Sequence, residues 1–313
     1  MPVPPEIDAA YLRAALERAG VAASFDAIQT TTYSDGRSGA VVTGVRAGRD
    51  RFVVKAIDDE QGFRAVLSSL PGGEVALFRS GATRDLPAPL AWPVLDASRQ
   101  GGRGQWWLLM HDVADGILPR GAFDPDKLHA LLRGMSRLHA RYWGNERALD
   151  ALPLLRPDAI ARLFAEPASL VARNEPPAEP TFLHGDLRRA NISYLNTSVC
   201  LLDWERAMRG HAAIDLQWYW FLQFWAYPPS EPCDPDAFRR AYLAYLEEAL
   251  GRAVDREAFG RAWGLAWLKV IAEIGFLIAD PLTEASPSAQ EIARVSATAK
   301  RAIALARKAM DHV

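Results

Sequence analysis

The chain has 313 residues, of which 50% are hydrophobic and 24% are charged, and its formal net charge at pH 7 is −2. This balance is typical of a folded globular protein, and the charge gives no reason to expect a nucleic-acid partner or an anionic membrane surface. The length favours two lobes over one compact core. Two distant cysteines, Cys200 and Cys233, indicate no disulfide framework and fit a reducing cytoplasm. We expect no signal peptide, and no membrane span because polar residues interrupt the longest apolar runs.

The N-terminal third predicts a helix followed by a small sheet. Periodicity predicts a helix over residues 6–19, strands over residues 27–33, 40–46, 51–57 and 105–110, and a proline-rich connection over residues 87–96. A polar turn over residues 34–39 joins the first two strands and contains Ser34, Gly36, Ser38 and Gly39. Backbone N–H groups of such a turn can bind phosphate. Hairpin turns commonly contain glycine, so the turn alone fits an ordinary connection equally well.

The third strand contains a lysine inside an apolar run. Strand alternation places Lys55 on the same face as Val53 and Ile57, where an ammonium group is costly unless it is paired. Glu74, at the start of a helical pattern, is the carboxylate that we expect to pair with it. The structural alternative is an edge-strand lysine that reaches into solvent.

The strongest functional signal is the stretch TFLHGDLRRANISYLNTSVCLLDWE. Its two apolar runs, residues 192–195 and 199–202, are separated by a polar turn and predict a β-hairpin. We expect this hairpin to bring Asp186 and Asn191 close to Asp203. Two carboxylates and a carboxamide suit a hard cation such as Mg²⁺. The alternative is an ordinary polar loop, in which Asp and Asn only form turns.

The C-terminal half is mostly helical. Helical spacing predicts helices that begin near residues 126 and 214, and further helices over residues 153–173, 236–250, 256–280 and 289–309. Residues 206–213 predict a short connection. No A-P-E motif and no long phosphorylatable loop occurs there, which argues against a regulated protein kinase.

The spacing of the polar residues matches that of kinases. Four residues separate Asp186 from Asn191, and Asp203 follows, in the kinase order of catalytic Asp, metal-binding Asn and metal-binding Asp. The motifs HGDLRRAN and LLDWE resemble the aminoglycoside phosphotransferase and choline kinase superfamily, which includes ecdysteroid kinase-like proteins. This resemblance implies an α+β, protein-kinase-like bilobal fold. Its N-terminal lobe would be an antiparallel sheet with helices over residues 1–110, and its mainly helical C-terminal lobe would cover residues 111–313.

The resemblance also implies an ATP- and Mg²⁺-dependent phosphotransferase with an alcohol group as acceptor. Asp186 would orient the acceptor hydroxyl, and Asn191 and Asp203 would hold Mg²⁺. Arg188 either stabilises charge on the transferred phosphoryl group or forms an ordinary surface ion pair. Arg189 is expected to be structural.

Nucleotide contacts follow from the same resemblance. Lys55, aligned by Glu74, would bind the α- and β-phosphates, and the turn of residues 34–39 would cover them. Backbone groups at Met110 and His111 would contact the adenine. His184 would hold the catalytic loop by hydrogen bonding.

The sequence predicts a small hydroxylated molecule as the acceptor but does not identify it further. Residues 206–280 offer two sets of candidates: the rings Trp218, Tyr219, Trp220, Phe221, Trp225, Trp263 and Trp267, and the carboxylates Glu205, Asp215, Glu231, Asp234, Glu273 and Asp280. Most of the rings are expected to be core packing. A metabolite kinase, an antibiotic kinase and a nucleotide-binding pseudokinase without turnover are the alternatives, and the oligomeric state is open.

Overall fold

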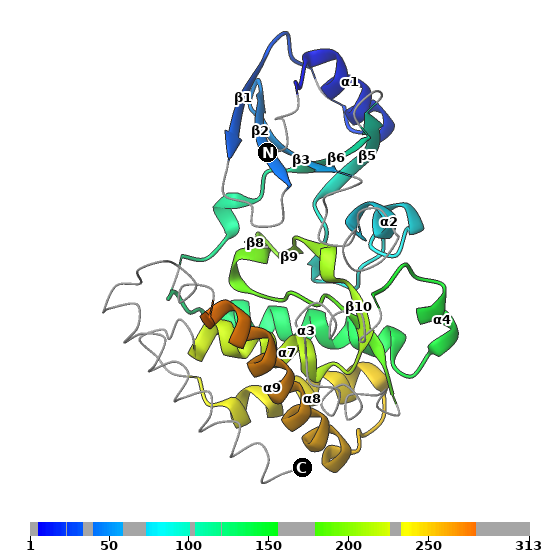
Figure 1. The fold of residues 1–313 in the computed structure, drawn as a ribbon, viewed down its shortest axis with the longest axis vertical. Coiled ribbons are helices and arrows are strands. Elements are labelled where there is room, and N and C mark those ends of the chain that lie inside the picture. Colours follow the sequence, from blue (N-terminus) through cyan, green and yellow to red (C-terminus); the bar gives the residue numbers. More distant parts are fainter. Residues whose placement is uncertain are drawn as a thin grey trace. The chain divides into compact units, whose positions relative to one another are not determined.

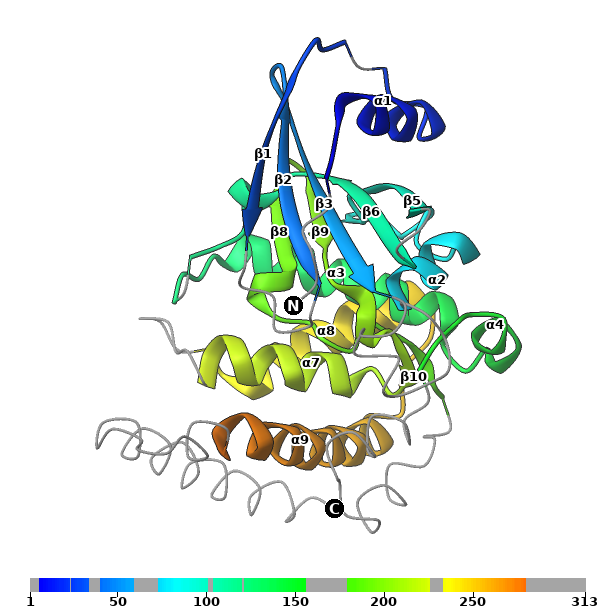
Figure 2. The ribbon, with the colours of Figure 1, turned by 45° about the horizontal axis from the view of Figure 1, so that its top comes forward.

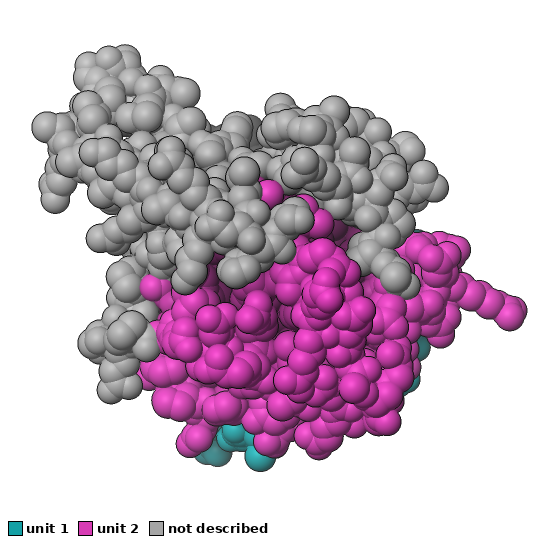
Figure 3. All heavy atoms as spheres, turned by 90° about the horizontal axis from the view of Figure 1, so that it is seen from below, with its two compact units in different colours: residues 1–117, 191–206 teal, residues 118–190, 207–313 magenta. Residues whose placement is uncertain are grey.

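The computed structural model describes residues 6–22, 24–33, 40–58, 73–100, 104–119, 121–155, 179–225 and 233–279. It divides the chain into two compact units, Met1–Ile117 with Asn191–Arg206, and Leu118–Ala190 with Ala207–Val313 (Figure 3). A boundary between functional lobes near residue 111 stays a prediction. None of the helices among the described residues is both long enough and apolar enough to cross a bilayer.

The first unit is built around a five-stranded sheet (Figures 1 and 2). Its elements are α1 (Ala9–Arg18), β1 (Ile28–Tyr33), β2 (Val41–Ala47), β3 (Asp50–Asp58), α2 (Gly73–Ser80), β4 (Leu90–Ala91), β5 (Val94–Gln100), β6 (Gln105–His111), a 3₁₀ turn (Ala114–Gly116), β8 (Ile192–Leu195), β9 (Ser198–Leu201) and a second 3₁₀ turn (Trp204–Arg206). The strand order is β1-β2-β3-β6-β5, and every neighbouring pair is antiparallel. The predicted antiparallel N-terminal sheet is therefore confirmed.

One strand of this sheet was not expected. Residues 87–96 were predicted to be a connection, but β5 begins at Val94 and pairs with β6 along its length. Most side chains of β5 are half-buried, because it is an edge strand, so the sequence alternation that would reveal it is weak. The prediction of a connection was therefore wrong from Val94 onward, and in its first part Leu90–Ala91 forms the short strand β4, which pairs parallel with β9.

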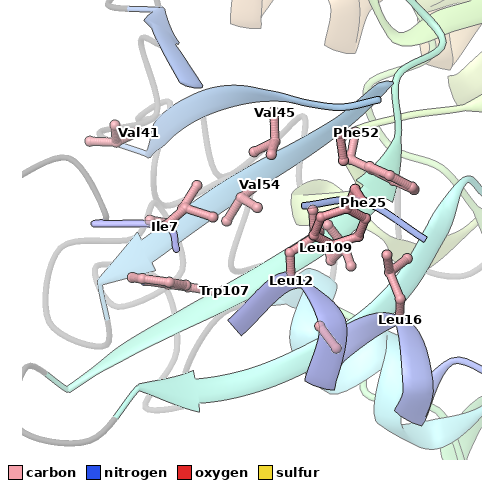
Figure 4. Packing of buried hydrophobic residues seen from close by; sticks show 13 residues of the cluster. Ile7, Leu12, Leu16, Phe25, Val41, Val45, Phe52, Val54, Trp107 and Leu109 are labelled. Carbon is pink, nitrogen blue, oxygen red and sulfur yellow. The ribbon is translucent and has the colours of Figure 1, made fainter. Parts of the chain in front are cut away.

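Each face of the sheet packs against a helix. On one face Phe52 and Val54 lie in a core with Leu12 and Leu16, which α1 directs toward the strands (Figure 4). On the other face Ile57 of β3 packs with Val75 of α2 and Leu108 of β6. Alternation along β3 therefore places Lys55 on the α2 face, as predicted.

The hairpin β8–β9 is present as predicted, with Ile192 opposite Leu201. Its two-residue turn begins at Asn196, whose φ of 52° is a left-handed conformation that asparagine tolerates. Beyond the last pair, the Leu202 N–H donates to the Asn191 carbonyl at 2.8 Å. Asn191 and the residue before Asp203 are thus held together at the same end of the hairpin.

The second unit is mainly helical. Its elements are α3 (Pro125–Tyr142), α4 (Glu146–Asp150), β7 (Thr181–Leu183), β10 (Met208–Gly210), α7 (Ala213–Trp220) followed by a π-helical turn (Phe221–Trp225), α8 (Pro235–Leu250) and α9 (Arg256–Ala279). A 3₁₀ turn (Arg189–Asn191) leads from this unit into β8. In both ribbon views α7 and α9 lie side by side (Figures 1 and 2). Four predicted helices are confirmed by α3, α7, α8 and α9.

Two predictions for this unit need correction. Residues 206–213 are not only a connection, because β10 pairs antiparallel with β7. A three-residue strand is too short to carry a detectable alternation. Of the helix predicted over residues 153–173, the structure describes only the first three residues, and Leu155 there forms a β-bridge with Met208. The helix predicted over residues 289–309 lies outside the described residues.

Candidate active site

A buried lysine lies between two carboxylates in the first unit. The Lys55 Nζ atom is 2.6 Å from Glu74 Oε2 and 2.8 Å from Asp203 Oδ1. The Lys55 side chain is 10% exposed and that of Glu74 is 1% exposed, so neither charge is screened by water. The ion pair predicted between Lys55 and Glu74 is therefore present. Asp203, which was predicted to bind the metal, also pairs with Lys55.

The surrounding charges keep this lysine protonated. Burial by itself lowers the pKa of Lys55, but three nearby carboxylates, with that of Asp203 first among them, outweigh burial and raise the pKa well above its usual value. A buried cation with two directly bound carboxylates is strongly coupled to both of them. Lys55 therefore keeps its positive charge inside this cluster.

Glu74 also fixes the backbone next to Asp203. Its second oxygen, Oε1, accepts the backbone N–H of Trp204 at 2.9 Å. Asp203 itself has φ of 60°, a left-handed conformation that is uncommon outside glycine but that Asp and Asn tolerate. Such conformations persist where surrounding contacts hold them, and they are concentrated at functional sites. The sequence contains no local signal for this hydrogen bond.

The end of the β8–β9 hairpin offers suitable ligands for a hard cation. Asn191 is buried, the Asp203 side chain is 28% exposed, and both supply oxygen atoms, which Mg²⁺ and Ca²⁺ prefer. No three His, Cys, Asp or Glu residues in the described part of the chain could hold a metal by themselves. An ion bound by Asn191 and Asp203 would therefore complete its shell with water and phosphate oxygens, as Mg²⁺ usually does.

The residues predicted to contact adenine lie at the end of β6. Met110 is opposite Val53, and antiparallel partners share a face, so its side chain is on the same face as Lys55. The His111 backbone N–H donates to the Pro93 carbonyl at 3.0 Å. An adenine contact at His111 would therefore use its carbonyl oxygen. Ser34, Gly36, Ser38 and Gly39 lie outside the described residues, and their contact with phosphate stays a prediction.

In the second unit, α7 holds the backbone of the HGD sequence. The two oxygens of Asp215 accept the N–H groups of His184 at 2.7 Å and Gly185 at 2.8 Å. Gly185 has φ of 80°, a conformation open to glycine but strained for other residues. The His184 ring nitrogen Nδ1 accepts the Asp186 N–H at 3.2 Å, so the hydrogen bonding expected of His184 is present.

The carboxylate of Asp186 is held by two side chains of the same unit. The indole Nε1–H of Trp218 donates to Asp186 Oδ1 at 2.7 Å. The Arg188 Nε atom lies 3.0 Å from Asp186 Oδ2, and the Arg188 side chain is 44% exposed. Arg189 donates instead to the Leu118 carbonyl. The surface ion pair left open for Arg188 is thus formed with Asp186.

A buried polar layer supports Asp215. His139 Nε2 lies 3.5 Å from Asp215 Oδ2, and His139 Nδ1 is 2.7 Å from the Tyr242 hydroxyl. Burial, assisted by the charge of Asp215, raises the pKa of Tyr242 well above its usual value, so this hydroxyl stays protonated. Burial, with a contribution from His139, lowers the pKa of His211 to about 3. His211 is therefore neutral, and its Nδ1 accepts the Ala213 N–H at the start of α7 at 3.1 Å.

The hydrogen-bond partners on α7 were not expected from the sequence. Asp215 was considered as an acceptor-site carboxylate, but it is fully buried and both its oxygens bind backbone N–H groups. Its presence in an otherwise apolar run was the available signal, because a buried carboxylate needs hydrogen-bond donors. Trp218 was grouped with core rings, and its neighbours Trp220 and Trp267 do pack on each other with centroids 5.7 Å apart. Trp225, Glu231, Glu273 and Asp280 have no described side chains.

The fold and these two groups of residues define the class of protein-kinase-like small-molecule phosphotransferases. Residues 55–258, well over half of the chain, match the model of the phosphotransferase enzyme family. The chain therefore belongs to that family. The match includes Lys55, Glu74, Asp186, Asn191 and Asp203. Among curated proteins, no sequence matches the chain significantly.

Solved structures give the same fold at low sequence identity. Amicoumacin kinase hAmiN, in complex with AMP-PNP, Ca²⁺ and Ami, is 14% identical over 88% of this chain and 87% of its own, with a TM-score of 0.60. Spectinomycin phosphotransferase, in complex with ADP and spectinomycin, is 11% identical over 99% of this chain and 100% of its own, with a TM-score of 0.55. An ethanolamine kinase of Plasmodium vivax is 12% identical over 90% of this chain and 84% of its own, with a TM-score of 0.51. The predicted α+β kinase-like fold is confirmed.

Proposed function

We propose that this protein transfers the γ-phosphate of ATP to a hydroxyl group of a small molecule, with Mg²⁺ as the metal ion. The observation that carries the proposal is the buried Lys55, held between Glu74 and Asp203. A lysine paired with a helix glutamate and a metal-binding aspartate is the kinase arrangement for binding nucleotide phosphates. Similar structures with AMP-PNP and Ca²⁺, or with ADP, support a nucleotide and a divalent metal.

Each of these residues has one task in the proposed reaction. Asp186 accepts a hydrogen bond from the acceptor hydroxyl and directs its oxygen toward the γ-phosphorus. The new O–P bond forms as the bond to the β–γ bridging oxygen breaks, ADP leaves with the electron pair, and the hydroxyl proton passes to Asp186. Lys55 balances the charge of the α- and β-phosphates. Mg²⁺, held by Asn191 and Asp203, supplies further positive charge at the phosphates when it is bound.

Arg188 is proposed as a second catalytic group. Its exposed side chain can leave Asp186 and contact the transferred phosphoryl group, where a guanidinium can bind two oxygens at once. The positive charge of Arg188, which pairs with Asp186 in the absence of substrate, would then stabilise the negative charge of the phosphoryl group.

The acceptor is proposed only as a class of molecule. The similar structures include a spectinomycin phosphotransferase and an ethanolamine kinase, so their acceptors belong to different classes of molecule. Metabolite and antibiotic acceptors are two versions of the same proposal. A pseudokinase is disfavoured because Lys55, Asp186, Asn191 and Asp203 are all present.

The experiment is a panel assay of Mg·ATP-dependent ADP release with amino alcohols, sugars, homoserine, choline and aminoglycosides. We expect at least one acceptor to raise ADP release well above the rate with water, and the phosphorylated product to be detected by mass spectrometry. Lys55→Met should lose this stimulation. Two results together would favour the pseudokinase. The protein would bind Mg·ATP but form no product with any acceptor, and Lys55→Met would leave the rate of ADP release unchanged.

A further inference from the structure

Helix α7 contacts the catalytic loop at two points. Asp215 accepts two backbone N–H groups of the loop, and Trp218 donates its indole N–H to Asp186. Residues three apart on a helix lie on the same face, so both contacts come from one side of α7. The first contact fixes the backbone of the loop, and the second fixes a carboxylate side chain.

The contact from Trp218 has the properties of a rigid anchor. Trp218 is 6% exposed and Asp186 is 8% exposed, so water competes weakly for this bond. A short hydrogen bond to a carboxylate is stronger than one between neutral groups, and the bond here is 2.7 Å long. An indole side chain has only two rotatable bonds and its nitrogen only donates. Trp218 therefore cannot move a proton itself, and any effect on the reaction must act through Asp186.

We propose that Trp218 is a positioning residue that commits Asp186 Oδ1 to the protein and directs Oδ2 toward the acceptor hydroxyl. This inference rests on the proposed role of Asp186. Oδ2 is the oxygen that Arg188 approaches, and the exposed Arg188 side chain can withdraw when the acceptor binds. The carboxylate then has one orientation when the hydroxyl arrives, and the entropic cost of ordering it is already met by the fold.

The same helix provides a matched control. Trp220 is 7% exposed, close to the value for Trp218, and its indole N–H makes no hydrogen bond in the described part of the chain. Changing either tryptophan to Phe removes the same atoms from α7. Only Trp218→Phe removes a hydrogen bond to Asp186.

The first test does not need turnover. In ¹⁵N-labelled full-length protein, each indole N–H gives its own NMR signal, and Trp218→Phe and Trp220→Phe identify two of them by loss. Asp186→Ala, which removes the acceptor, should shift the Trp218 signal and speed its hydrogen exchange, while the Trp220 signal stays in place. An unmoved Trp218 signal would show that the bond does not exist in solution and would overturn the inference.

The second test measures catalysis with Mg·ATP and water as the acceptor, by ADP release. Trp218→Phe should lower kcat about 10- to 100-fold with an unchanged KM for ATP, whereas Trp220→Phe should match the wild type. Benzothienylalanine at position 218 keeps the ring shape without the N–H, and it should reproduce the loss in case Phe disturbs packing. Equal losses in Trp218→Phe and Trp220→Phe, or wild-type kcat with benzothienylalanine, would contradict a positioning role.

Asp186→Asn separates this inference from the proposed function. If Asp186→Asn is inactive while Trp218→Phe is normal, the inference fails and the proposed function stands. If Asp186→Asn turns over normally, the proposed role of Asp186 fails. If the wild type releases no ADP with water, the same kcat comparison is made with the acceptor found in the panel assay.

Discussion

The two units hold the carboxylates that we propose to be functional by different means. In the first unit, Asp203 and Glu74 bind the charged Lys55, so the contact is an ion pair. In the second unit, Asp215 binds backbone N–H groups and Asp186 accepts an indole N–H, so these buried donors are neutral, whereas Arg188, which also pairs with Asp186, is 44% exposed. Removing one partner from a buried ion pair leaves an uncompensated charge, and removing a neutral donor leaves one carboxylate oxygen without its hydrogen bond.

This difference matches the chemistry proposed for each group. Nucleotide phosphates and a metal ion carry net charge, so the residues that bind them must supply opposite charge. An acceptor hydroxyl is neutral and needs a base held at the correct angle. Changes in the first unit should therefore alter binding of Mg·ATP, and changes in the second should alter turnover.

The largest expected effect is that of Asp203→Asn. This change removes a proposed metal ligand and one of the two carboxylates on Lys55, so turnover should fall to background and Mg·ATP should bind more weakly. Lys55 keeps Glu74, so circular dichroism should report an intact fold. Calorimetry measures the affinity, with Asp50→Asn, an exposed aspartate at the start of β3, as the control. Unchanged Mg·ATP affinity would count against the metal role.

Asp186→Asn should lower kcat strongly without changing the affinity for ATP. Loss of an orienting or general-base group typically costs about 10²–10⁴-fold in rate, so we expect kcat to fall within that range. The affinity for ATP should stay near the wild-type value, because Asp186 binds neither phosphate nor metal in the proposed mechanism. Rates are measured with the acceptor found in the panel assay. A near-normal kcat would remove Asp186 from the reaction.

Arg188 tests whether a charged group also acts in the second unit. Arg188→Ala should lower kcat about tenfold and raise the KM for ATP less, because the contact strengthens in the transition state. Arg188→Lys should recover part of the loss. Arg189→Ala is the comparison, since Arg189 donates to the Leu118 carbonyl. Equal and mild effects of the two alanine variants would place both arginines outside the mechanism.

The smallest effect concerns the neutral layer under α7. The pKa of His211 is lowered from 6.5 to about 3 in the fold, so below pH 6.5 the unfolded chain binds a proton that the folded chain does not. His211 therefore has no pH effect on stability above pH 6.5 and costs stability as the pH falls toward 3. Between pH 7 and pH 5 the cost is about 2 kcal/mol. His211→Asn should lose that much less stability over this interval.

Urea unfolding at pH 7 and pH 5 measures this difference between wild type and His211→Asn. The asparagine carboxamide can still accept the Ala213 N–H, so the start of α7 keeps a hydrogen-bond acceptor. Parallel losses of stability in both proteins would show that His211 is not held neutral, and would weaken the contrast between a charged and a neutral unit.

The sequence by itself determined the local parts of this protein. Alternation placed Lys55 on the face opposite Val54, and the turn at Asn196 set the hairpin that ends at Asn191 and Asp203. These features depend on a period of two residues or on a two-residue turn, so neighbouring residues are enough to specify them. The kinase-like fold followed from motifs within that same short stretch.

The tertiary structure alone decided which distant groups hold these residues. Glu74 reaches the Trp204 N–H across 130 positions of the chain, and Trp218 reaches Asp186 across 32. The short strand β10 likewise exists only because β7 provides its partner. No local period encodes such pairs, because they depend on how whole helices and strands pack. A buried donor and a buried acceptor find each other only after that packing has excluded water.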